Sequence, residues 1–126
     1  MPAIILILDA EPIVRQVVTT ILGRAGFTVL ATGDLHEAER LTRESAPDLL
    51  LTNVYVPGSS GREAASLLRQ ICPEMRALLV AGLPDEEPVR KAMAENGLPY
   101  FPKPFTASEL TARVREVLGA PSERSL

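Results

Sequence analysis

The stretch "DLLLTNVYVPGSSG" (residues 48–61) places an apolar run directly before two polar residues and a Pro-Gly turn. Short, continuous apolar runs are typical of strands that are buried on both faces of a sheet. We therefore predict a buried strand over 48–53 that ends on Asn53, and a loop over 54–61 that leads into a helix. The strand end needs an explanation, because Asn53 carries a neutral carboxamide.

Apolar runs and amphipathic segments alternate along the rest of the chain. The predicted strands are 3–8, 27–32, 48–53, 77–82 and 99–101. The first predicted helix runs from Pro12 to a cap at Gly26, and the next two cover 35–45 and 62–71. A fourth helix is predicted within 83–97, and the last one begins after Thr106 or Ser108 and ends at 119. This alternation predicts an α/β fold, a three-layer doubly wound parallel sheet with right-handed crossovers and helices on both faces.

Local signals mark the helix ends and their apolar faces. Pro12 suits the first turn of a helix, and glycine is common just after a helix ends. The apolar face of the first helix is predicted by its residues at helical spacing, Ile13, Val17, Ile21 and Leu22. The last helix has a similar stripe at Leu110, Val114, Val117 and Leu118. The predicted N-terminal caps are Asp34, Ser59 or Ser60, and Thr106 or Ser108.

Composition narrows the classes of function. The chain has 126 residues, which fits one domain, and a net charge of −3 with a pI of about 5.2. It lacks the basic footprint of a nucleic-acid-binding protein and the polybasic patch of a membrane-surface protein, so we expect no direct nucleic-acid contact and no membrane contact. The single Cys72 cannot form an internal disulfide, which favours a reducing, cytoplasmic location.

In a parallel α/β sheet, ligands bind at the carboxyl ends of the strands. The residues at these ends are therefore the candidates for chemistry. They are Asp9, Ala10, Glu11, Thr32, Asn53, Ala81, Gly82 and Lys103.

These strand ends stand within a pattern that resembles the receiver domain of bacterial two-component response regulators, the CheY-like superfamily. The matching pieces include "ILILDAEPIVR", "APDLLLTNVYVPGSSGREAASLLR" and "PYFPKPFTASELTARVREVL". The Pro-Gly-x-x-Gly loop and the Lys-Pro-Phe after the last strand are specific when they occur together at this spacing. The resemblance covers about residues 3–119, and it implies a receiver domain over 1–119 with a tail or linker stump over 120–126. It also implies the flavodoxin-like strand order 2-1-3-4-5.

The resemblance implies phosphoryl transfer to an aspartate at the end of the third strand. Magnesium would lie between this aspartate and an acidic pair after the first strand. Three further residues complete the family's switch. A lysine after the fifth strand contacts the phosphoryl oxygens, and a hydroxyl residue at the end of the fourth strand bonds to the phosphoryl group. An aromatic residue on the fifth strand changes position on the outer face.

Three of these positions carry the wrong side chain here. Asn53 stands at the phosphoacceptor position, Ala10 at the second acid, and Ala81 at the hydroxyl. An aspartyl phosphate needs a carboxylate nucleophile, which a carboxamide is not. We therefore expect a degenerate pseudo-receiver that has no catalytic residue, is not an enzyme and does not depend on phosphorylation.

Other positions keep the family residue. Asp9 matches the first acid, Lys103 and Pro104 match the Lys-Pro pair, and Tyr100 matches the aromatic. Asp9 alone would make a weak or absent metal site, since the family's third acid, here Glu11, points away. We expect no cofactor, with magnesium weak or absent, and a pocket in which Lys103 pairs with Asp9 and donates to the Asn53 oxygen.

The resemblance also suggests partners. Receivers regulate through the face of their fourth helix, fifth strand and fifth helix, which here includes Arg90, Lys91, Tyr100 and Arg113. We expect a histidine kinase or another signalling protein as the partner, with a homodimer as the alternative. The sequence around 97–120 is more similar to receivers of hybrid sensor kinases than to those of DNA-binding regulators.

Two other functions stay open from the sequence. The first is a phosphoacceptor with relocated chemistry, which would use Glu11, Ser59 or Ser60. The second is a small-molecule sensor that uses the emptied pocket.

Overall fold

The computed structural model describes residues 2–53, 55–81, 100–102 and 106–119, and gives only the backbone of 55, 81 and 100–102. The predicted fourth helix within 83–97 and the tail over 120–126 lie outside the described residues, as do Arg90, Lys91, Lys103 and Pro104. The described strands are β1 (Ile4–Leu8), β2 (Thr28–Thr32), β3 (Leu49–Asn53), β4 (Tyr55–Val56), β5 (Ser59–Ser60), β6 (Arg76–Ala81) and β7 (Tyr100–Pro102). The described helices are α1 (Pro12–Arg24), α2 (Leu35–Ser45), α3 (Gly61–Ile71) and α5 (Ala107–Gly119).

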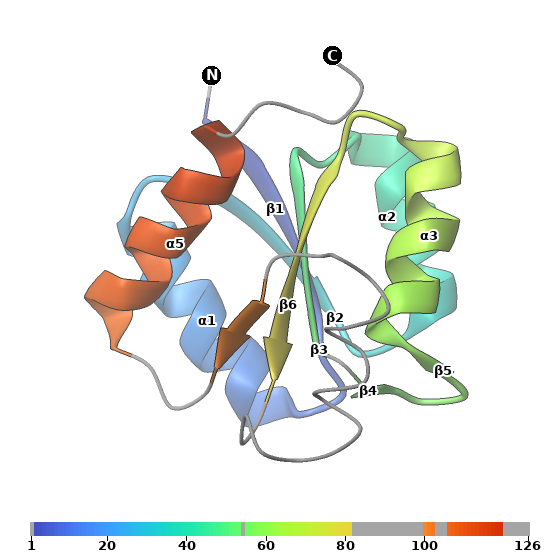
Figure 1. The fold of residues 1–126 in the computed structure, drawn as a ribbon, viewed down its shortest axis with the longest axis horizontal. Coiled ribbons are helices and arrows are strands. Elements are labelled where there is room, and N and C mark those ends of the chain that lie inside the picture. Colours follow the sequence, from blue (N-terminus) through green and yellow to red (C-terminus); the bar gives the residue numbers. More distant parts are fainter. Residues whose placement is uncertain (1, 54, 82–99, 103–105, 120–126) are drawn as a thin grey trace.

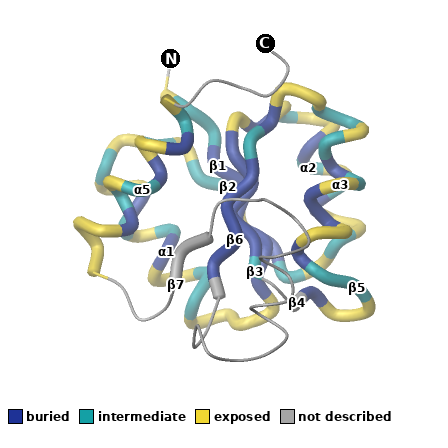
Figure 2. The backbone as a smooth tube through the Cα atoms, in the orientation of Figure 1, coloured by how far each residue is buried: buried dark blue, intermediate teal, exposed yellow. Residues whose placement is uncertain are grey.

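The main sheet has the order β2-β1-β3-β6-β7, and all its neighbouring strands are parallel. This order confirms the predicted 2-1-3-4-5 arrangement. Helices α1 and α5 cover one face of the sheet, and α2 and α3 cover the other (Figure 1). The result is the predicted three-layer α/β fold, with the central strands buried between the two helical layers (Figure 2).

Alternate residues of each strand serve the two halves of the core, because successive side chains point to opposite faces of a sheet. Ile5 and Ile7 of β1 belong to the cluster under α1 and α5, whereas Leu6 and Leu8 belong to the cluster under α2 and α3. Leu50 of β3 pairs with Leu6 and packs on the same side. The continuous apolar run of β3 is therefore explained by its burial on both faces.

Side-chain caps begin three of the described helices. Asp34 accepts a hydrogen bond from the Glu37 N–H at 3.1 Å, and Ser60, rather than Ser59, caps α3 in the same way. The Thr106 hydroxyl accepts from the Glu109 N–H at 3.1 Å, while the Glu109 carboxylate accepts from the Thr106 N–H at 2.9 Å. This reciprocal capping box assigns Thr106, rather than Ser108, as the cap of α5.

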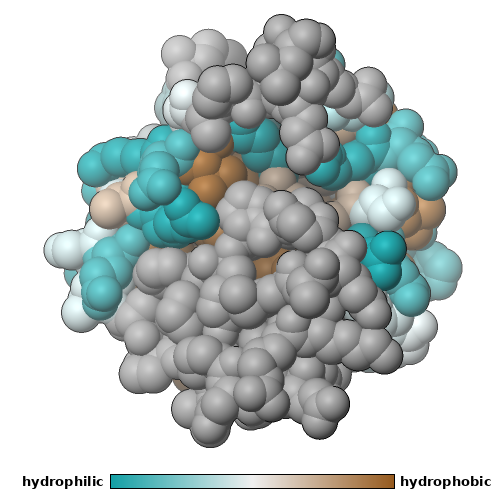
Figure 3. Space-filling view, viewed as in Figure 1, coloured by the Kyte–Doolittle hydropathy of each residue, from teal (hydrophilic) through white to brown (hydrophobic). Residues whose placement is uncertain are grey.

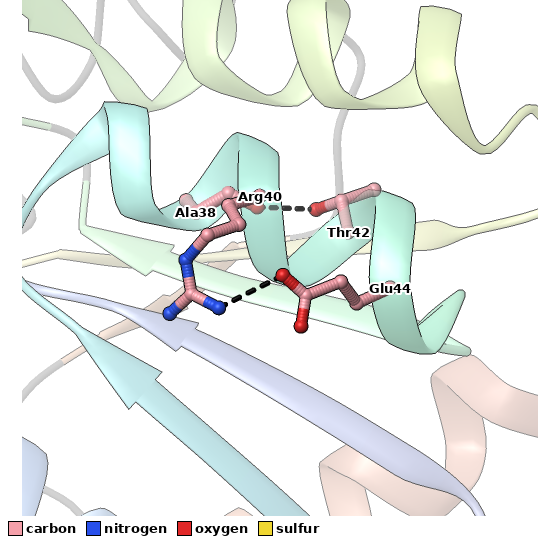
Figure 4. A network of polar contacts seen from close by, with 4 residues as sticks. All are labelled: Ala38, Arg40, Thr42 and Glu44. Atoms are coloured by element: carbon pink, nitrogen blue, oxygen red, sulfur yellow. Dashed lines mark hydrogen bonds and ion pairs between the residues drawn. The ribbon is translucent and has the colours of Figure 1, made fainter.

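Helix α2 shows how a polar residue is accommodated on a buried face. The Thr42 hydroxyl is buried and donates to the Ala38 carbonyl at 2.7 Å, so its burial leaves no unsatisfied donor (Figure 4). On the exposed side, Arg40 and Glu44 form an ion pair at 2.8 Å one helical turn apart (Figure 4). The helix thus has a satisfied hydroxyl on its buried face and an ion pair on its exposed face.

The prediction of a loop over 54–61 was wrong, since this segment contains a short antiparallel hairpin. Val56 of β4 pairs with Ser59 of β5 across Pro57 and Gly58. Gly58 has a φ of 75°, which suits the third position of a turn with proline at the second. The Pro-Gly pair predicted the turn correctly. The strands on either side of it have only two residues each, which is too short for the alternating apolar pattern of a strand to appear in the sequence.

The predicted apolar face of α1 was also partly wrong. Val18 and Leu22 are buried against the sheet, but Ile13 is 73% exposed and Val17 is 48% exposed. The helix is apolar around more of its circumference than the sheet covers, and spacing alone could not show which side faces inward. At its end, the C-cap is Ala25, and Gly26 follows with a φ of 100°.

The remaining boundaries are close to the prediction. β6 and β7 each lie one residue away from the predicted ranges of 77–82 and 99–101. The stripe on α5 is confirmed, with its first three members buried and Leu118 packed beside them. In the described part of the chain, no helix is both long and apolar enough to cross a membrane.

Gly61 is predicted to be intolerant of a side chain. A Cβ at this position would collide with the Asn53 carbonyl oxygen and lie 2.9 Å from Leu79 Cδ2. Gly61→Ala should therefore reduce the free energy of unfolding by about 1–3 kcal/mol through overpacking. Gly23→Ala is the matched control, because open space surrounds Gly23 in α1, and it should instead stabilise by up to about 1 kcal/mol. Urea unfolding of both variants measures the difference, and equal effects would contradict this packing.

Glu109 should titrate at a lower pH than an ordinary glutamate. The hydrogen bond from the Thr106 backbone, and secondly that from its side chain, lowers the pKa of this carboxyl. A lowered pKa in the folded state stabilises the fold above the ordinary glutamate pKa, and this contribution is lost as the pH falls through the lowered value. An NMR titration of the carboxyl carbon should show the low midpoint, retained in Thr106→Ser and partly raised in Thr106→Ala. A midpoint unchanged by Thr106→Ala would show that the hydroxyl plays no part.

Candidate functional site

The carboxyl ends of β1 and β3 lie side by side in the middle of the sheet. Leu8 pairs with Thr52, so Asp9 and Asn53 leave neighbouring strands at the same edge. Both residues line a small cavity of about 10 Å³, together with apolar residues of β1, β3, β6 and α1. The structure therefore brings Asp9 and Asn53 together at one edge of the sheet.

Asp9 is held firmly in place and is only 4% exposed. Its Oδ1 accepts a hydrogen bond from the Glu11 N–H at 2.9 Å, and its own N–H donates to the Thr32 carbonyl at 3.1 Å. The first bond ties the carboxylate to the turn between β1 and α1. Asp9 thus helps to begin α1, which is a structural role that its position in the sequence does not reveal.

Ala10 and Glu11 are exposed at the start of α1. Ala10 brings no oxygen ligand to the pocket, and Glu11 serves as the N-cap residue without a side-chain capping bond. The residues between β1 and α1 therefore contribute one buried carboxylate, that of Asp9.

Arg15 adds a positive charge that the sequence analysis missed. Its Nη1 donates to the Asp9 carbonyl oxygen at 2.7 Å, and the residue is half-buried. A Cβ on Gly33 would lie 2.5 Å from the same nitrogen, so the guanidinium occupies the space that this glycine leaves. The sequence does contain a signal for this contact, because Arg15 lies in the first turn of a helix that directly follows the acidic residue at a strand end. Residue spacing, however, could not show that the Arg15 side chain points back toward Asp9.

Asn53 is fixed through its backbone. Its carbonyl oxygen accepts from the Thr52 hydroxyl at 3.0 Å and lies against the buried Gly61 at the start of α3. The β4–β5 hairpin connects these two contact points, so it sets the position of α3 relative to the end of β3. Gly61 was identified only as the last residue of the Pro-Gly-x-x-Gly loop, and the contact gives the reason that a glycine is needed.

Ser59 and Ser60 are engaged in the start of α3. The Ser59 hydroxyl donates to the Glu63 carboxylate at 2.9 Å, and the Ser60 hydroxyl accepts from the Glu63 N–H. Both hydroxyls therefore have local structural partners.

The remaining predicted site residues are placed only in part. The backbone of Ala81 pairs with that of Pro102, so β6 and β7 end at the same edge as β1 and β3. Tyr100 lies on the edge strand β7, opposite Leu79. Lys103 and Pro104 lie outside the described residues, so the predicted pairing of Lys103 with Asp9 stays a prediction. Arg113 of α5 forms an ion pair with Glu116 at 2.6 Å.

Metal ligands are sparse in the described part of the site. Within residues 2–53, 55–81, 100–102 and 106–119, no group of three or more His, Cys, Asp or Glu residues is arranged to hold a metal ion. Magnesium prefers several oxygen ligands in near-octahedral geometry, and it dehydrates reluctantly. The described carboxylates alone do not supply that set.

Comparisons with known proteins agree with this architecture. The transcriptional regulator NtrC of Azospirillum brasilense is 29% identical over 94% of this chain, which spans 24% of that protein. The response regulator MtrA of Mycolicibacterium smegmatis is 32% identical over 88% of this chain, which spans 48% of that protein. The chain thus spans about a quarter to a half of the length of these relatives, both of which are named as DNA-binding regulators.

Solved structures show the same fold. A putative response regulator from Chloroflexus aurantiacus superimposes with a TM-score of 0.84 and 27% identity, covering 95% of this chain and all of that one. A receiver domain from Clostridium thermocellum gives a TM-score of 0.78 and 27% identity over 92% of this chain and 94% of that one. The profile of the response regulator receiver domain matches residues 5–115. The chain therefore belongs to the response regulator receiver domain family, the signalling modules of two-component systems.

Proposed function

We propose that this receiver domain signals through protein contacts and does not accept a phosphoryl group on an aspartate. The observation that carries the proposal is the position of Asn53, which ends β3 beside the buried Asp9 at the carboxyl edge of the sheet. A carboxamide there keeps hydrogen-bonding capacity but has neither the charge nor the nucleophilicity that an acyl phosphate requires.

The local charge supports the same conclusion. Three carboxylates at one strand edge would repel one another and would favour a divalent cation. Here Ala10 and Asn53 are neutral, so Asp9 is the one carboxylate among these three positions, and the Arg15 guanidinium contacts its backbone. The described part of the pocket is close to neutral without any metal. Asp9 is therefore assigned a structural role, and magnesium binding is proposed to be weak or absent.

A receiver without this chemistry needs another source of regulation. A two-state switch responds only to a ligand that prefers one of its states. We propose that a signalling protein, such as a histidine kinase, supplies that preference by binding, in the reducing cytoplasm that the lone Cys72 favours. Homodimerisation is the alternative route.

Direct contact with nucleic acid is not part of the proposal for this domain. The acidic net charge of −3 argues against it. The DNA-binding relatives are two to four times longer than the matched region, so their names describe whole proteins. They do not support the closer similarity to hybrid kinases that we expected.

A small-molecule sensor at the emptied pocket is less favoured. The cavity beside Asp9 and Asn53 measures about 10 Å³, which is about the space of a single water molecule. Pockets for small molecules generally measure about 300–1,000 Å³. Among the described side chains, the space beside Asp9 and Asn53 is therefore far smaller than such a pocket.

Intact-mass measurement after incubation with a small phosphodonor and magnesium tests the proposal. The wild type should gain no phosphoryl group, because position 53 has no carboxylate. The double variant Asn53→Asp, Ala10→Asp should gain one, since it restores the acceptor and a metal ligand. The single variant Ala10→Asp is the matched control, which restores the ligand alone and should stay unmodified.

A phosphorylated wild type would overturn the proposal. Peptide mapping would then locate the modified residue, and Glu11, Ser59 and Ser60 are the first positions to inspect. Modification of any of them would establish relocated acceptor chemistry.

A further inference from the structure

Strand β2 forms one edge of the main sheet, and no described strand pairs with its outer side. Its bonds to β1 fix which backbone groups point inward, since the Thr32 carbonyl accepts from the Asp9 N–H at 3.1 Å. Successive residues of a strand present their N–H and C=O groups to opposite sides, so Val29 and Ala31 direct theirs away from β1. The outer side of β2 is therefore an open row of donors and acceptors.

The β2 edge lacks the charges and prolines that usually protect an edge strand. The chain has no charged residue and no proline from Ala25 to Gly33, and Thr28 and Ala31 of the strand are exposed. By contrast, β7 at the opposite edge has three residues and ends on Pro102. Short length and proline are both features that blunt an edge. Of the two edges, β2 is therefore the one that can accept another strand.

Charged side chains gather on the helices instead. On the face shown in Figure 3, hydrophilic side chains dominate both flanks, and the largest hydrophobic area lies between the two helical layers. Helix α2 carries the exposed ion pairs of Arg40 with Glu44 and of Arg43 with Glu39. The outer surfaces of the helices thus suit contact with water, whereas β2 suits contact with another uncharged strand.

A second copy of β2 matches this edge by symmetry. In an antiparallel pair with its two-fold axis at Leu30, Val29 of one copy lies opposite Ala31 of the other. Both residues point outward, so each such pair exchanges two hydrogen bonds, as antiparallel pairs do. This register uses every outward N–H and C=O group of Val29 and Ala31.

The side chains across this junction are also compatible. Leu30 would contact its own copy on the α2 side of the sheet, and it is only partly buried in the single chain. Val29 would contact Ala31 on the α1 side, and Thr28 would lie opposite Thr32. All of these cross-strand pairs are uncharged, and apolar and threonine pairs at such positions stabilise antiparallel sheets.

Opposite charges flank the uncharged stretch. Arg24 precedes it at the end of α1, Asp34 follows it as the N-cap of α2, and both residues are exposed. An antiparallel pair brings the start of one β2 to the end of the other, so Arg24 of each copy lies near Asp34 of the other copy. A parallel pair would place like charges side by side, which is unfavourable. The charges therefore favour the antiparallel arrangement.

Helix α1 leaves room for the second copy. Arg15, Thr19 and Gly23 follow one another at four-residue spacing, which places them on one stripe of α1. Arg15 reaches the space beside Gly33, directly after β2, so this stripe faces the β2 edge. Thr19 and Gly23 are small, and nothing lies within 4 Å of a Cβ placed on Gly23. The two copies of α1 can therefore lie beside each other above the joined sheets.

We propose that two copies of this chain pair antiparallel through β2, so that their main sheets form one continuous sheet. The contact consists of Val29, Leu30 and Ala31, with Arg24 and Asp34 at its ends. An unrelated extended peptide would satisfy the same backbone groups but would not account for the opposite charges at the two ends. This proposal specifies a surface for the homodimer named above, and it does not depend on whether position 53 can be phosphorylated.

Sedimentation velocity of the whole chain over a range of concentrations tests the proposal. The wild type should show a monomer–dimer equilibrium. Ala31→Pro removes an outward N–H and Ala31→Lys adds charge to the junction, so each should raise the dimer dissociation constant at least about tenfold. Ala31→Val is the matched control, because it keeps the N–H and adds no charge, and it should change the constant by less than about twofold. Because Ala31 is exposed, Ala31→Lys should fold like the wild type, which circular dichroism verifies.

Amide hydrogen exchange of the wild type gives a second readout that needs no variant. The Val29 and Ala31 N–H groups should exchange at least about tenfold more slowly at high protein concentration than at low concentration, because pairing covers them. The Leu30 N–H points toward β1, so it should be equally protected at both concentrations.

Several results would overturn the proposal. These are a monomer at every concentration, a dimer that Ala31→Pro and Ala31→Lys leave intact, or exchange of Val29 and Ala31 that does not depend on concentration. A dimer that Tyr100→Ala dissociates and the Ala31 variants do not would place the interface at the opposite edge. Polymers larger than a dimer would contradict the closed two-fold pairing. The intact-mass result tests the phosphorylation proposal separately, so the two can fail independently.

Discussion

Burial of β1 and β3 on both faces is the constraint on which the rest of the structure depends. Their side chains alternate between two apolar clusters, one under each helical layer. Because both faces are covered, the polar residues of these strands collect at their ends, where the backbone leaves the sheet. Asp9 and Asn53 are therefore forced into proximity by the register of Leu8 with Thr52. The site is a consequence of how the core is built.

The same constraint fixes the chemistry that the site can support. A buried charge needs a partner or hydrogen bonds, since its transfer out of water is costly. Asp9 obtains hydrogen bonds from the first turn after β1, and the Arg15 guanidinium lies on its backbone carbonyl. The neutral residues at positions 10 and 53 remove the repulsion that a divalent cation relieves in an acidic pocket. The proposed weakness of metal binding and the proposed absence of acceptor chemistry therefore have one shared cause, the neutral side chains at these two positions.

If the central pocket carries no switch chemistry, the outer surfaces carry the specificity of the domain. Helix α1 has one face in the core and one face in solvent. Val18 and Leu22 hold it to the sheet, while Ile13 and Val17 are exposed. Apolar character on both sides of this helix is the reason that residue spacing alone did not identify its buried face.

The sequence by itself determined the alternation of strands and helices, the strand order through the family resemblance, and the side chains at the strand ends. Periodicity and capping residues are local properties, so Asp34 at the start of α2 and the buried run of β3 could be predicted from neighbouring residues alone. Only the tertiary structure decided which side of α1 faces the sheet, that Arg15 lies on the Asp9 backbone, and that Gly61 must admit the Asn53 carbonyl. These features arise where segments distant in sequence meet. The pattern of one segment cannot specify the direction from which another approaches it.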